Sequence, residues 1–255
     1  MLYYILLFVS RNYNLMIIEE QLILTPEKAL IVDDTAIIAD LHLGLENAML
    51  EKGVAIPRLQ IIEIINSVRQ IIEKYNVERL IIAGDLKHEF SRNLPYEWED
   101  VELFLNSFKD IELEIVRGNH DNYLATILSK YGILLKEKIK IKGWTVVHGH
   151  KECNESKIIM GHEHPAIKIK FRGGLYSYPC YLKITKDSQT IIVLPAFSPI
   201  VSGVDILTTD KFLSPILKEV KDIELFAIGE GEVIHIPLRN ITVLPIIKDE
   251  DFKMG

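Results

Sequence analysis

The 255-residue sequence has only two cysteines and fewer basic than acidic residues. Its two cysteines, Cys153 and Cys180, do not form a CxxC pair, so no disulfide framework is expected and a reducing, cytoplasmic setting fits the composition. A basic arm for nucleic acid is not expected either, because 29 Lys and Arg stand against 36 Asp and Glu. A GxxxxGK loop for nucleoside triphosphates is also missing from the sequence.

The amino-terminal apolar stretch, residues 2–9, is too short to span a bilayer. It has no basic region before it and no small-residue cleavage site after it, so it is not typical of a signal peptide. We therefore expect no stable membrane insertion. Residues 1–15 are interpreted as an extension outside the core. An artefactual upstream start, with Met16 as the true first residue, would produce such an extension. Since no repeat or Gly/Ser linker follows, residues 16–255 are predicted to form one domain.

Short apolar runs that end in polar clusters recur in the first two thirds of the sequence. Such runs are typical of buried strands, which are predicted at 35–39, 79–83, 113–116, 144–147 and 157–160. Helical patterns lie between them at 58–75, 96–109 and 122–131. This alternation predicts an α/β fold, in which ligands bind outside the carboxyl ends of the strands. After Gly161, runs at 176–185, 191–195 and 232–237 predict a second sheet packed on the first.

Seven of the eight histidines fall at the ends of these predicted strands. The clusters read Asp40-Leu41-His42, Gly84-Asp85 with His88 three residues on, Gly118-Asn119-His120-Asp121, His148-Gly149-His150 and Gly161-His162-Glu163-His164. Carboxylate, imidazole and amide donors together suit divalent ions such as manganese, iron or zinc. The Asp-x-His and His-x-His spacings are expected to point both side chains of a pair to one side of an extended segment.

Several of these residues also have a purely structural interpretation. Asp40, Asp85 and Asn119 can each cap a turn or helix at a strand end. Glu163 is expected to be a surface charge. His150 has two interpretations that stay open, as a brace for the site or as an exposed side chain. The grouping of all five clusters at strand ends nevertheless favours a metal site.

The ordered series DxH, GD, GNHD, HGH and GHxH, from Asp40 to His164, resembles the calcineurin-like metallophosphoesterase superfamily. The stretches GDLKHEF, GHEHP and LPAF are similar to its archaeal branch related to the SbcD nuclease subunit, and to bacterial ligase-associated DNA-damage-response endonucleases. The resemblance implies a four-layer α-β-β-α sandwich with two mixed β-sheets. It covers most of the chain, from about residue 26 to residue 237.

The resemblance further implies a dinuclear metal centre, with manganese as the first choice and iron, zinc, nickel or magnesium as alternatives. One ion would be held by Asp40, His42, Asp85 and His164, and the other by Asp85, Asn119, His148 and His162. A metal-bridging hydroxide would attack the phosphorus in line. His120 occupies the family's position for the acid that protonates the leaving oxygen, and Asp121 would orient it. His88 completes neither ligand set and is expected on the substrate side, as a phosphate contact that favours a diester.

The leading functional prediction is a phosphodiesterase that acts as a nuclease on DNA or RNA, with a helicase or ligase partner implied by the family analogy. The acidic charge and the lack of an aromatic-basic groove weigh against nucleic acid. One alternative is a small-substrate phosphoesterase for cyclic nucleotides, nucleotide esters or phosphomonoesters. Another is a metal-bound scaffold without activity. A phosphoprotein phosphatase is disfavoured because GDLKHEF lacks the second aspartate and the arginine of GDxxDRG.

Overall fold

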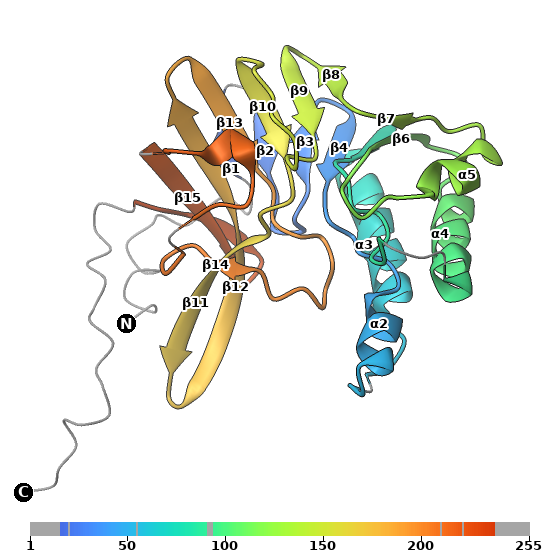
Figure 1. Cartoon of the computed structure of the whole chain (residues 1–255). Helices are drawn as coiled ribbons and strands as arrows, with labels where there is room; N and C mark the ends of the chain where they lie inside the picture. The colour runs from blue at the N-terminus through green and yellow to red at the C-terminus, as the bar shows by residue number, and fades with distance from the viewer. Residues whose placement is uncertain are drawn as a thin grey trace, which may run out of the picture.

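Two mixed β-sheets lie face to face, and the helices cover one of them (Figure 1). The computed structural model describes residues 16–19, 21–54, 56–90, 94–209, 211–220 and 222–237. The predicted α/β class with two mixed sheets is confirmed. The expected extension, residues 1–15, lies outside the described residues.

The first sheet has seven strands in sequence order. Its antiparallel part consists of β1 (Met16–Ile18), β2 (Leu22–Leu24), β3 (Leu30–Val32) and β4 (Thr35–Ile38). Parallel pairing then adds β5 (Arg79–Ile82), β6 (Glu112–Val116) and β7 (Leu135–Lys136). Parallel neighbours need crossover connections, and these contain α2 (Leu45–Glu51), α3 (Gln60–Tyr75), α4 (Pro95–Ser107) and α5 (Leu124–Ser129).

The second sheet has nine strands and begins earlier in the chain than expected. Its strands are β8 (Ile139–Ile141), β9 (Trp144–Val147), β10 (Lys157–Met160), β11 (Pro165–Phe171), β12 (Gly174–Lys186), β13 (Gln189–Val193), β14 (Val204–Asp205), β15 (Asp222–Gly229) and β16 (Glu232–Ile236). The expected start after Gly161 is wrong, because β8, β9 and β10 already belong to this sheet. Both β9 and β10 are buried parallel strands, and their sequence pattern does not distinguish one sheet from the other.

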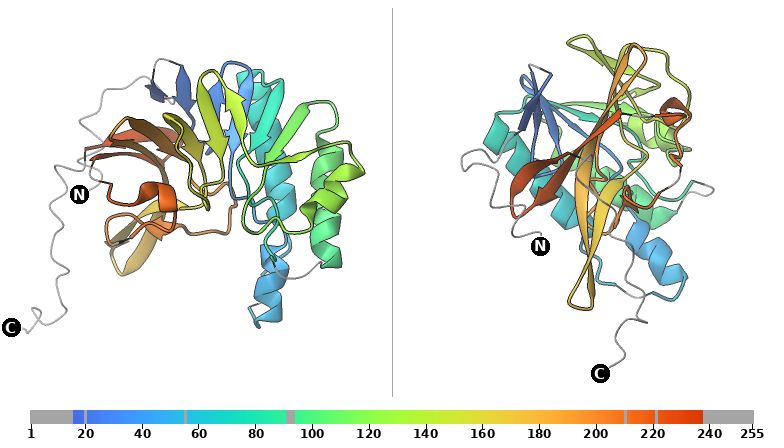
Figure 2. Two further views of the ribbon diagram at one scale, coloured as in Figure 1. Left: turned by 45° about the horizontal axis from the view of Figure 1, so that its top comes forward. Right: turned by 90° about the vertical axis from the view of Figure 1, so that its left-hand side faces the viewer.

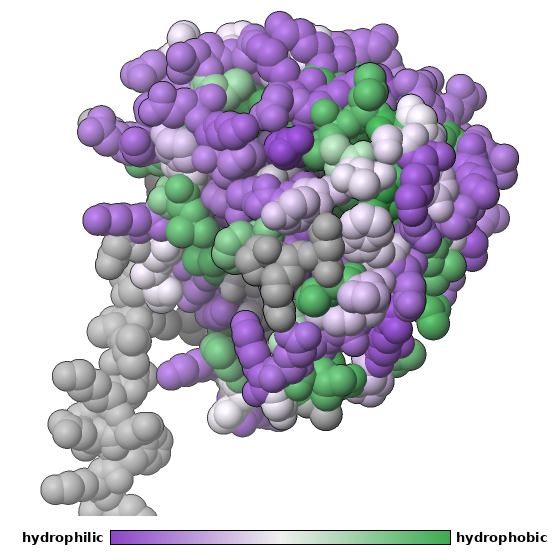
Figure 3. Space-filling model, turned by 45° about the vertical axis from the view of Figure 1, so that its right-hand side comes forward, coloured by the Kyte–Doolittle hydropathy of each residue, from purple (hydrophilic) through white to green (hydrophobic). Residues whose placement is uncertain are grey.

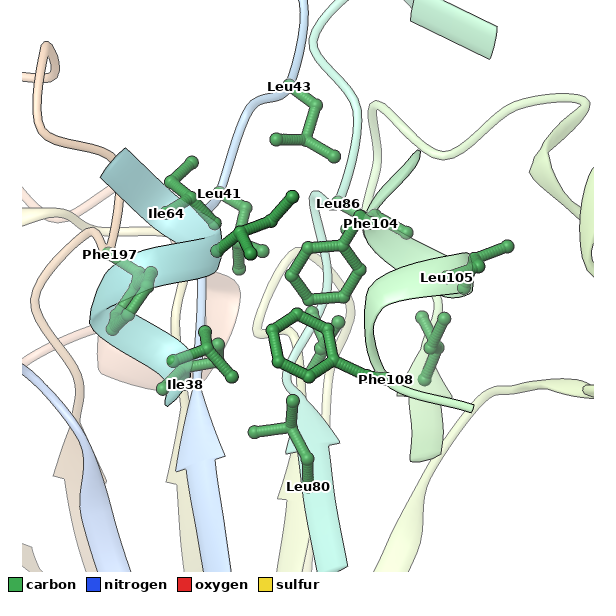
Figure 4. Close-up of a cluster of buried hydrophobic side chains, with 14 of the residues drawn as sticks. Ile38, Leu41, Leu43, Ile64, Leu80, Leu86, Phe104, Leu105, Phe108 and Phe197 are labelled. Carbon is green, nitrogen blue, oxygen red and sulfur yellow. The ribbon is translucent and has the colours of Figure 1, made fainter. Parts of the chain in front are cut away.

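Three apolar layers hold these elements together. The first lies between the helices and the first sheet, where Phe104 of α4 and Phe108, which directly follows α4, pack against Leu80 and Leu86 (Figure 4). The second layer fills the space between the two sheets, which face each other in Figure 2. The third lies on the outer face of the second sheet, where the 3-10 turn η1 (Pro215–Leu217) and its neighbouring loop cover the strands.

The predicted helices agree with the structure more closely where their apolar face is long. Helix α3 buries Ile61, Ile64, Ile65, Val68 and Ile71, as its spacing predicts. The run at 122–131 forms only the short α5, and α2 was not predicted because it has seven residues and no side-chain cap. Among the described residues, no helix is long and apolar enough to cross a membrane.

Tyr181 of β12 connects the two sheets with hydrogen bonds, and we predict that its hydroxyl stabilises the fold. It is fully buried, and its hydroxyl faces the carbonyl oxygens of Thr25 at 2.7 Å and Ala29 at 3.0 Å. Tyr181→Phe should lower the free energy of unfolding by about 1–2 kcal/mol, since buried carbonyls lose their donor. Chemical denaturation measures this. The matched control Tyr176→Phe, at a half-exposed ring, should change it little, and equal losses in both variants would contradict the interpretation.

Candidate metal centre

The five polar clusters meet at the carboxyl ends of neighbouring strands. Backbone hydrogen bonds continue the pairing past β4 and β5, because the amide of Asp40 donates to Gly84 at 3.1 Å and that of His42 donates to Asp85 at 3.0 Å. In the second sheet, the amide of Gly161 donates to the carbonyl of His148 at 3.1 Å. The loops that carry the clusters are therefore fixed by the sheets themselves.

A first group of donors consists of Asp40, His42 and His164, whose ligand atoms all lie within 4.8 Å of one another. The Nε2 atoms of His42 and His164 are 3.3 Å apart, and Nε2 of His164 is 3.4 Å from Oδ1 of Asp40. The fourth residue predicted for this ion, Asp85, places its Oδ2 at 3.9 Å from Nε2 of His42. The structure thus brings all four residues together.

A second group consists of Asp85, His148 and His162. Nε2 of His148 is 3.3 Å from Oδ2 of Asp85 and 3.1 Å from Nδ1 of His162. The Asn119 side-chain oxygen lies 3.0 Å from the same nitrogen. All four residues predicted for the second ion are therefore adjacent, and Asp85 is next to both groups.

A third group of donors was not predicted. His42, His88 and His120 also bring one ring nitrogen each within 4.8 Å of the others. Nδ1 of His88 is 3.5 Å from Nδ1 of His42, and the rings of His88 and His120 stack with centroids 5.4 Å apart. His88 is therefore a neighbour of a candidate ligand as well as of the candidate acid, and its substrate-side role stays a prediction.

The residues present fit divalent cations. Oδ1 of Asp40 is buried and has no hydrogen-bond partner among the described residues, which is costly unless an ion compensates it. Nδ1 of His148 faces the carbonyl oxygen of Ala83 at 3.0 Å. A metal-binding histidine commonly uses its second nitrogen in this way, because the hydrogen bond fixes the tautomer and leaves Nε2 free for the metal.

The pKa values of the histidines in the centre are shifted in different directions. Burial disfavours the charged ring and lowers the pKa of His42 to about 3, although Asp40 and Asp85 oppose this. Burial, helped by the charge of His148, lowers the pKa of His162 to about 4. At His148, the hydrogen bond and charge of Asp85 outweigh burial and raise the pKa to about 9. A cation that binds Nε2 of His148 must therefore displace a proton at neutral pH.

Five of the seven predicted ligands have left-handed backbone conformations. Their φ angles are 58° for Asp40, 48° for His42, 51° for Asp85, 75° for His162 and 46° for His164. The expectation that each pair projects from an extended segment is therefore wrong. Left-handed conformations are uncommon for residues other than glycine, and they cluster at functional sites whose surroundings enforce them.

Asp121 is one of the groups that enforce this backbone. Its buried carboxylate accepts hydrogen bonds from the amides of Asp85 at 2.9 Å, Gly118 at 2.8 Å and Lys87 at 3.3 Å. The expectation that Asp121 orients the His120 ring is not supported, because Nδ1 of that ring faces the carbonyl oxygen of His88 instead. The turn after β6 sends the Asp121 side chain inward, behind the loop that carries Asp85.

Glu163 is also a positioning residue, and its expected place on the surface is wrong. It is 3% exposed, and its carboxylate accepts hydrogen bonds from the amides of Leu213 at 3.1 Å and Ser214 at 2.5 Å. The Ser214 hydroxyl donates to the carbonyl oxygen of Gly149. Glu163 thereby ties the two histidine loops of the second sheet to the segment before η1. The GHEH motif does not indicate this role, because the hydrogen-bond partners of Glu163 are distant in the chain.

Gln60 at the start of α3 was missed as well. Gln60 is buried, and its side-chain nitrogen Nε2 lies 3.1 Å from the carbonyl oxygen of Leu41 and 3.0 Å from that of His42. It therefore holds the Asp40–His42 loop from behind. The one sequence signal for this role is the position of Gln60 at the start of a predicted helix.

His150 lies at the border of a pocket beside the centre. The pocket has a volume of about 550 Å³ and is lined by Arg117, Glu137, Lys138 and residues 147–155. His150 is partly exposed, and its buried Nδ1 has no hydrogen-bond partner among the described residues. Arg117 pairs with Glu137, with Nε and Oε1 3.4 Å apart. His150 therefore lines this pocket, next to the His148 ring.

We predict that Gly118→Ala weakens metal binding at least tenfold. A Cβ atom at Gly118 would lie 2.0 Å from Oδ1 of Asp85 and 2.3 Å from its backbone nitrogen, so the Asp85 loop would have to move. Calorimetric titration with Mn²⁺ measures the affinity. The control is Gly229→Ala, where the added Cβ meets only ordinary contacts with Tyr178. Unchanged affinity in Gly118→Ala would contradict the assignment of this loop to the metal centre.

Comparison with known proteins was made for the whole chain. Residues 34–227 match the family described as calcineurin-like phosphoesterase. A Pseudomonas putida nuclease, MPE, has a crystal structure with a TM-score of 0.65 and 22% identity, covering 88% of this chain and 100% of that one. The Escherichia coli phosphoesterase YfcE gives a TM-score of 0.43 and 13% identity, with 79% and 97% covered. No curated protein matches the sequence. The similarity to the Pseudomonas putida structure shows that the two chains share a fold.

Proposed function

Because this chain belongs to the calcineurin-like phosphoesterase family and is a metal-dependent phosphoesterase, we propose that its substrates are phosphodiesters, nucleic acid among them. The observation that carries the proposal is the position of the Asp85 carboxylate. Its Oδ2 lies 3.9 Å from Nε2 of His42 in one donor group and 3.3 Å from Nε2 of His148 in the other. One carboxylate can therefore serve two ions, as a two-metal centre requires.

The proposed ligands of the two ions are the residues whose donor atoms converge in the first and second donor groups. Asp40, His42, Asp85 and His164 would hold one ion, and Asp85, Asn119, His148 and His162 the other. When bound, such a pair of ions polarises the phosphoryl oxygens and activates the attacking water. Manganese is the proposed metal because the sequence resemblance implies it, and the mixture of carboxylate and amide oxygens with imidazole nitrogens suits it as it suits iron or zinc.

His120 is the proposed acid for the leaving oxygen. Its side chain is partly exposed, and its Nε2 lies 4.0 Å from Oδ2 of Asp85. Because Nδ1 faces the carbonyl oxygen of His88, that nitrogen carries a proton and the ring is held with Nε2 toward the centre. In its charged form, His120 can donate the Nε2 proton to the ester oxygen that departs.

His88 is the proposed contact to a non-bridging phosphoryl oxygen. Its Nδ1 is directed to His42, so Nε2 is the ring nitrogen that remains for the substrate. The amide of His88 donates to the carbonyl oxygen of Leu43 at 3.0 Å, which fixes the residue beside the Asp40–His42 loop. An imidazole at this position adds a hydrogen bond for a diester without adding a metal ligand.

Nucleic acid is proposed as the substrate because the Pseudomonas putida protein of similar fold is a nuclease. Basic residues are outnumbered in this chain, 29 to 36, so its electrostatic attraction to a polyanion is weak. A helicase or ligase partner, which the sequence resemblance implies, would supply that attraction. Within the proposal, the partner brings the strand and this chain cleaves it.

Asp85→Ala should lower diester turnover at least about hundredfold, since loss of partners that only support ligands already costs 10–100-fold. The measurement is a panel with Mn²⁺, consisting of bis-p-nitrophenyl phosphate, p-nitrophenyl phosphate, cyclic nucleotides and single- and double-stranded DNA. The control is Asp110→Ala, an exposed carboxylate in the turn between α4 and β6. Hydrolysis of the monoester far faster than that of every diester would contradict the diesterase proposal and favour a small-substrate phosphomonoesterase.

His88→Ala should retain bound metal and lose turnover, because the proposal places His88 on the substrate side. Metal content by mass spectrometry and diester turnover are measured on the same preparation. His235→Ala is the control, since that ring lies exposed on β16, far along the chain from the clusters. If His88→Ala loses metal, the group formed by His42, His88 and His120 is itself a ligand set, and the substrate-side role is wrong.

A further inference from the structure

Phe90 is an exposed aromatic residue at the edge of the centre. It is 57% exposed, and its ring meets the ring of His120 edge-on with centroids 5.9 Å apart. His120 stacks on His88 with an interplanar angle of 20°. The Phe90 ring is therefore adjacent to the imidazole that the proposed function assigns to the leaving oxygen.

Exposure alone does not distinguish Phe90. Single exposed apolar side chains are common on proteins, and Figure 3 shows hydrophobic residues in small groups among hydrophilic ones. What distinguishes Phe90 is its contact with His120 and its location. Of the three markedly exposed aromatic residues in the described part of the chain, Phe90, Tyr123 and Tyr176, the first contacts the His120 ring and the second follows His120 by three residues.

Two hydrogen bonds hold the backbone at Phe90 and at the residue before it. The Asn122 side-chain amide donates to the carbonyl oxygen of Phe90 at 3.0 Å. On the other side, Glu97 accepts a hydrogen bond from the amide of Glu89 at 2.5 Å, and its carboxylate lies 3.7 Å from Nζ of the fully buried Lys87. A ring on a fixed backbone loses little conformational entropy when a ligand stacks on it.

Tyr123, three residues after His120, has an uncommon backbone conformation. Its φ angle is 65°, a conformation that a bulky side chain rarely adopts, and the residue is 55% exposed. Strain of this kind persists where the surrounding structure enforces it, commonly next to ligands. Two exposed aromatic residues therefore lie near His120: Phe90 through a ring contact, and Tyr123 three residues further along the chain.

We propose that Phe90 is a stacking platform for the base of the departing nucleotide, so that the substrate is single-stranded nucleic acid. This inference rests on the proposed function. In a nucleotide, the sugar lies between the base and the ester oxygen. The Phe90 ring contacts the ring of His120, the proposed acid for that oxygen, so a base stacked on Phe90 would lie close to the proposed site of cleavage. Base–aromatic stacking accepts every base and is worth about five- to 150-fold in affinity.

A single strand is favoured over a duplex for two reasons. Bases in a duplex are already stacked on their neighbours, so their faces are not available to a protein ring. The acidic chain also cannot obtain its affinity from many phosphate contacts, which is the main source of affinity for duplexes. Stacking supplies affinity without basic residues, and it requires an unpaired base.

The test compares two dinucleotides in the presence of Mn²⁺. Product analysis of thymidylyl-thymidine first identifies the thymidine that departs, and the second substrate carries an abasic tetrahydrofuran in its place. Wild-type protein should show a kcat/KM about tenfold higher for the base-containing dinucleotide, within the range expected for stacking. Phe90→Ala should reduce this ratio to about one, and Phe90→Trp should restore it.

Leu134→Ala is the matched control, because Leu134 is also an exposed apolar residue and lies on a different loop. It should keep the tenfold ratio. An equal kcat/KM of the wild type for both dinucleotides, or an unchanged ratio in Phe90→Ala, would overturn the platform while leaving diester hydrolysis intact. Cleavage of duplex DNA faster than single strands would overturn it too. Failure of the proposed function gives a different result, with no turnover of either dinucleotide or of bis-p-nitrophenyl phosphate.

Discussion

The centre depends on a buried carboxylate that binds backbone amides rather than metal. Asp121 joins the loop after β5 to the loop after β6 through the amides of Asp85 and Gly118. Hydrogen bonds to a charged acceptor are stronger than neutral ones, and here they hold Asp85 in a conformation that costs about 1–3 kcal/mol by itself. Without them, the loop could relax to ordinary dihedral angles and the shared carboxylate would leave the position between the two donor groups.

The second requirement is the packing of the two sheets. The first sheet supplies Asp40, His42, Asp85 and Asn119, and the second sheet supplies His148, His162 and His164. Neither donor group is complete within one sheet. The apolar layer between the sheets and the Tyr181 hydroxyl therefore help to position the candidate metal ligands. The amide of His162 also donates to Oδ2 of Asp40 at 2.9 Å, which joins the sheets inside the centre itself.

The members of the site could be predicted from the sequence more completely than their supports. Strands that end in Asp, Asn or His place these residues at one edge of a sheet, so the convergence follows from the fold class. The inward turn of Asp121, the burial of Glu163 and the left-handed backbone depend on partners that are distant in the chain or on loop conformation. A two-residue motif carries no information on such contacts. The same holds for β9 and β10, whose apolar runs fit either sheet.

The charge of the chain limits how a phosphodiester can be recognised. Metal ions would reverse the local charge around Asp40 and Asp85, since two divalent cations outweigh two carboxylates. Charges on the surface beyond about 8–10 Å are screened at physiological ionic strength, so the acidic surface opposes the approach of a substrate more than its binding. Selectivity among diesters must then come from short-range contacts at the edge of the centre. The proposed phosphate contact of His88 is of this kind, and so is the proposed base contact of the Phe90 ring next to His120, which would not depend on salt.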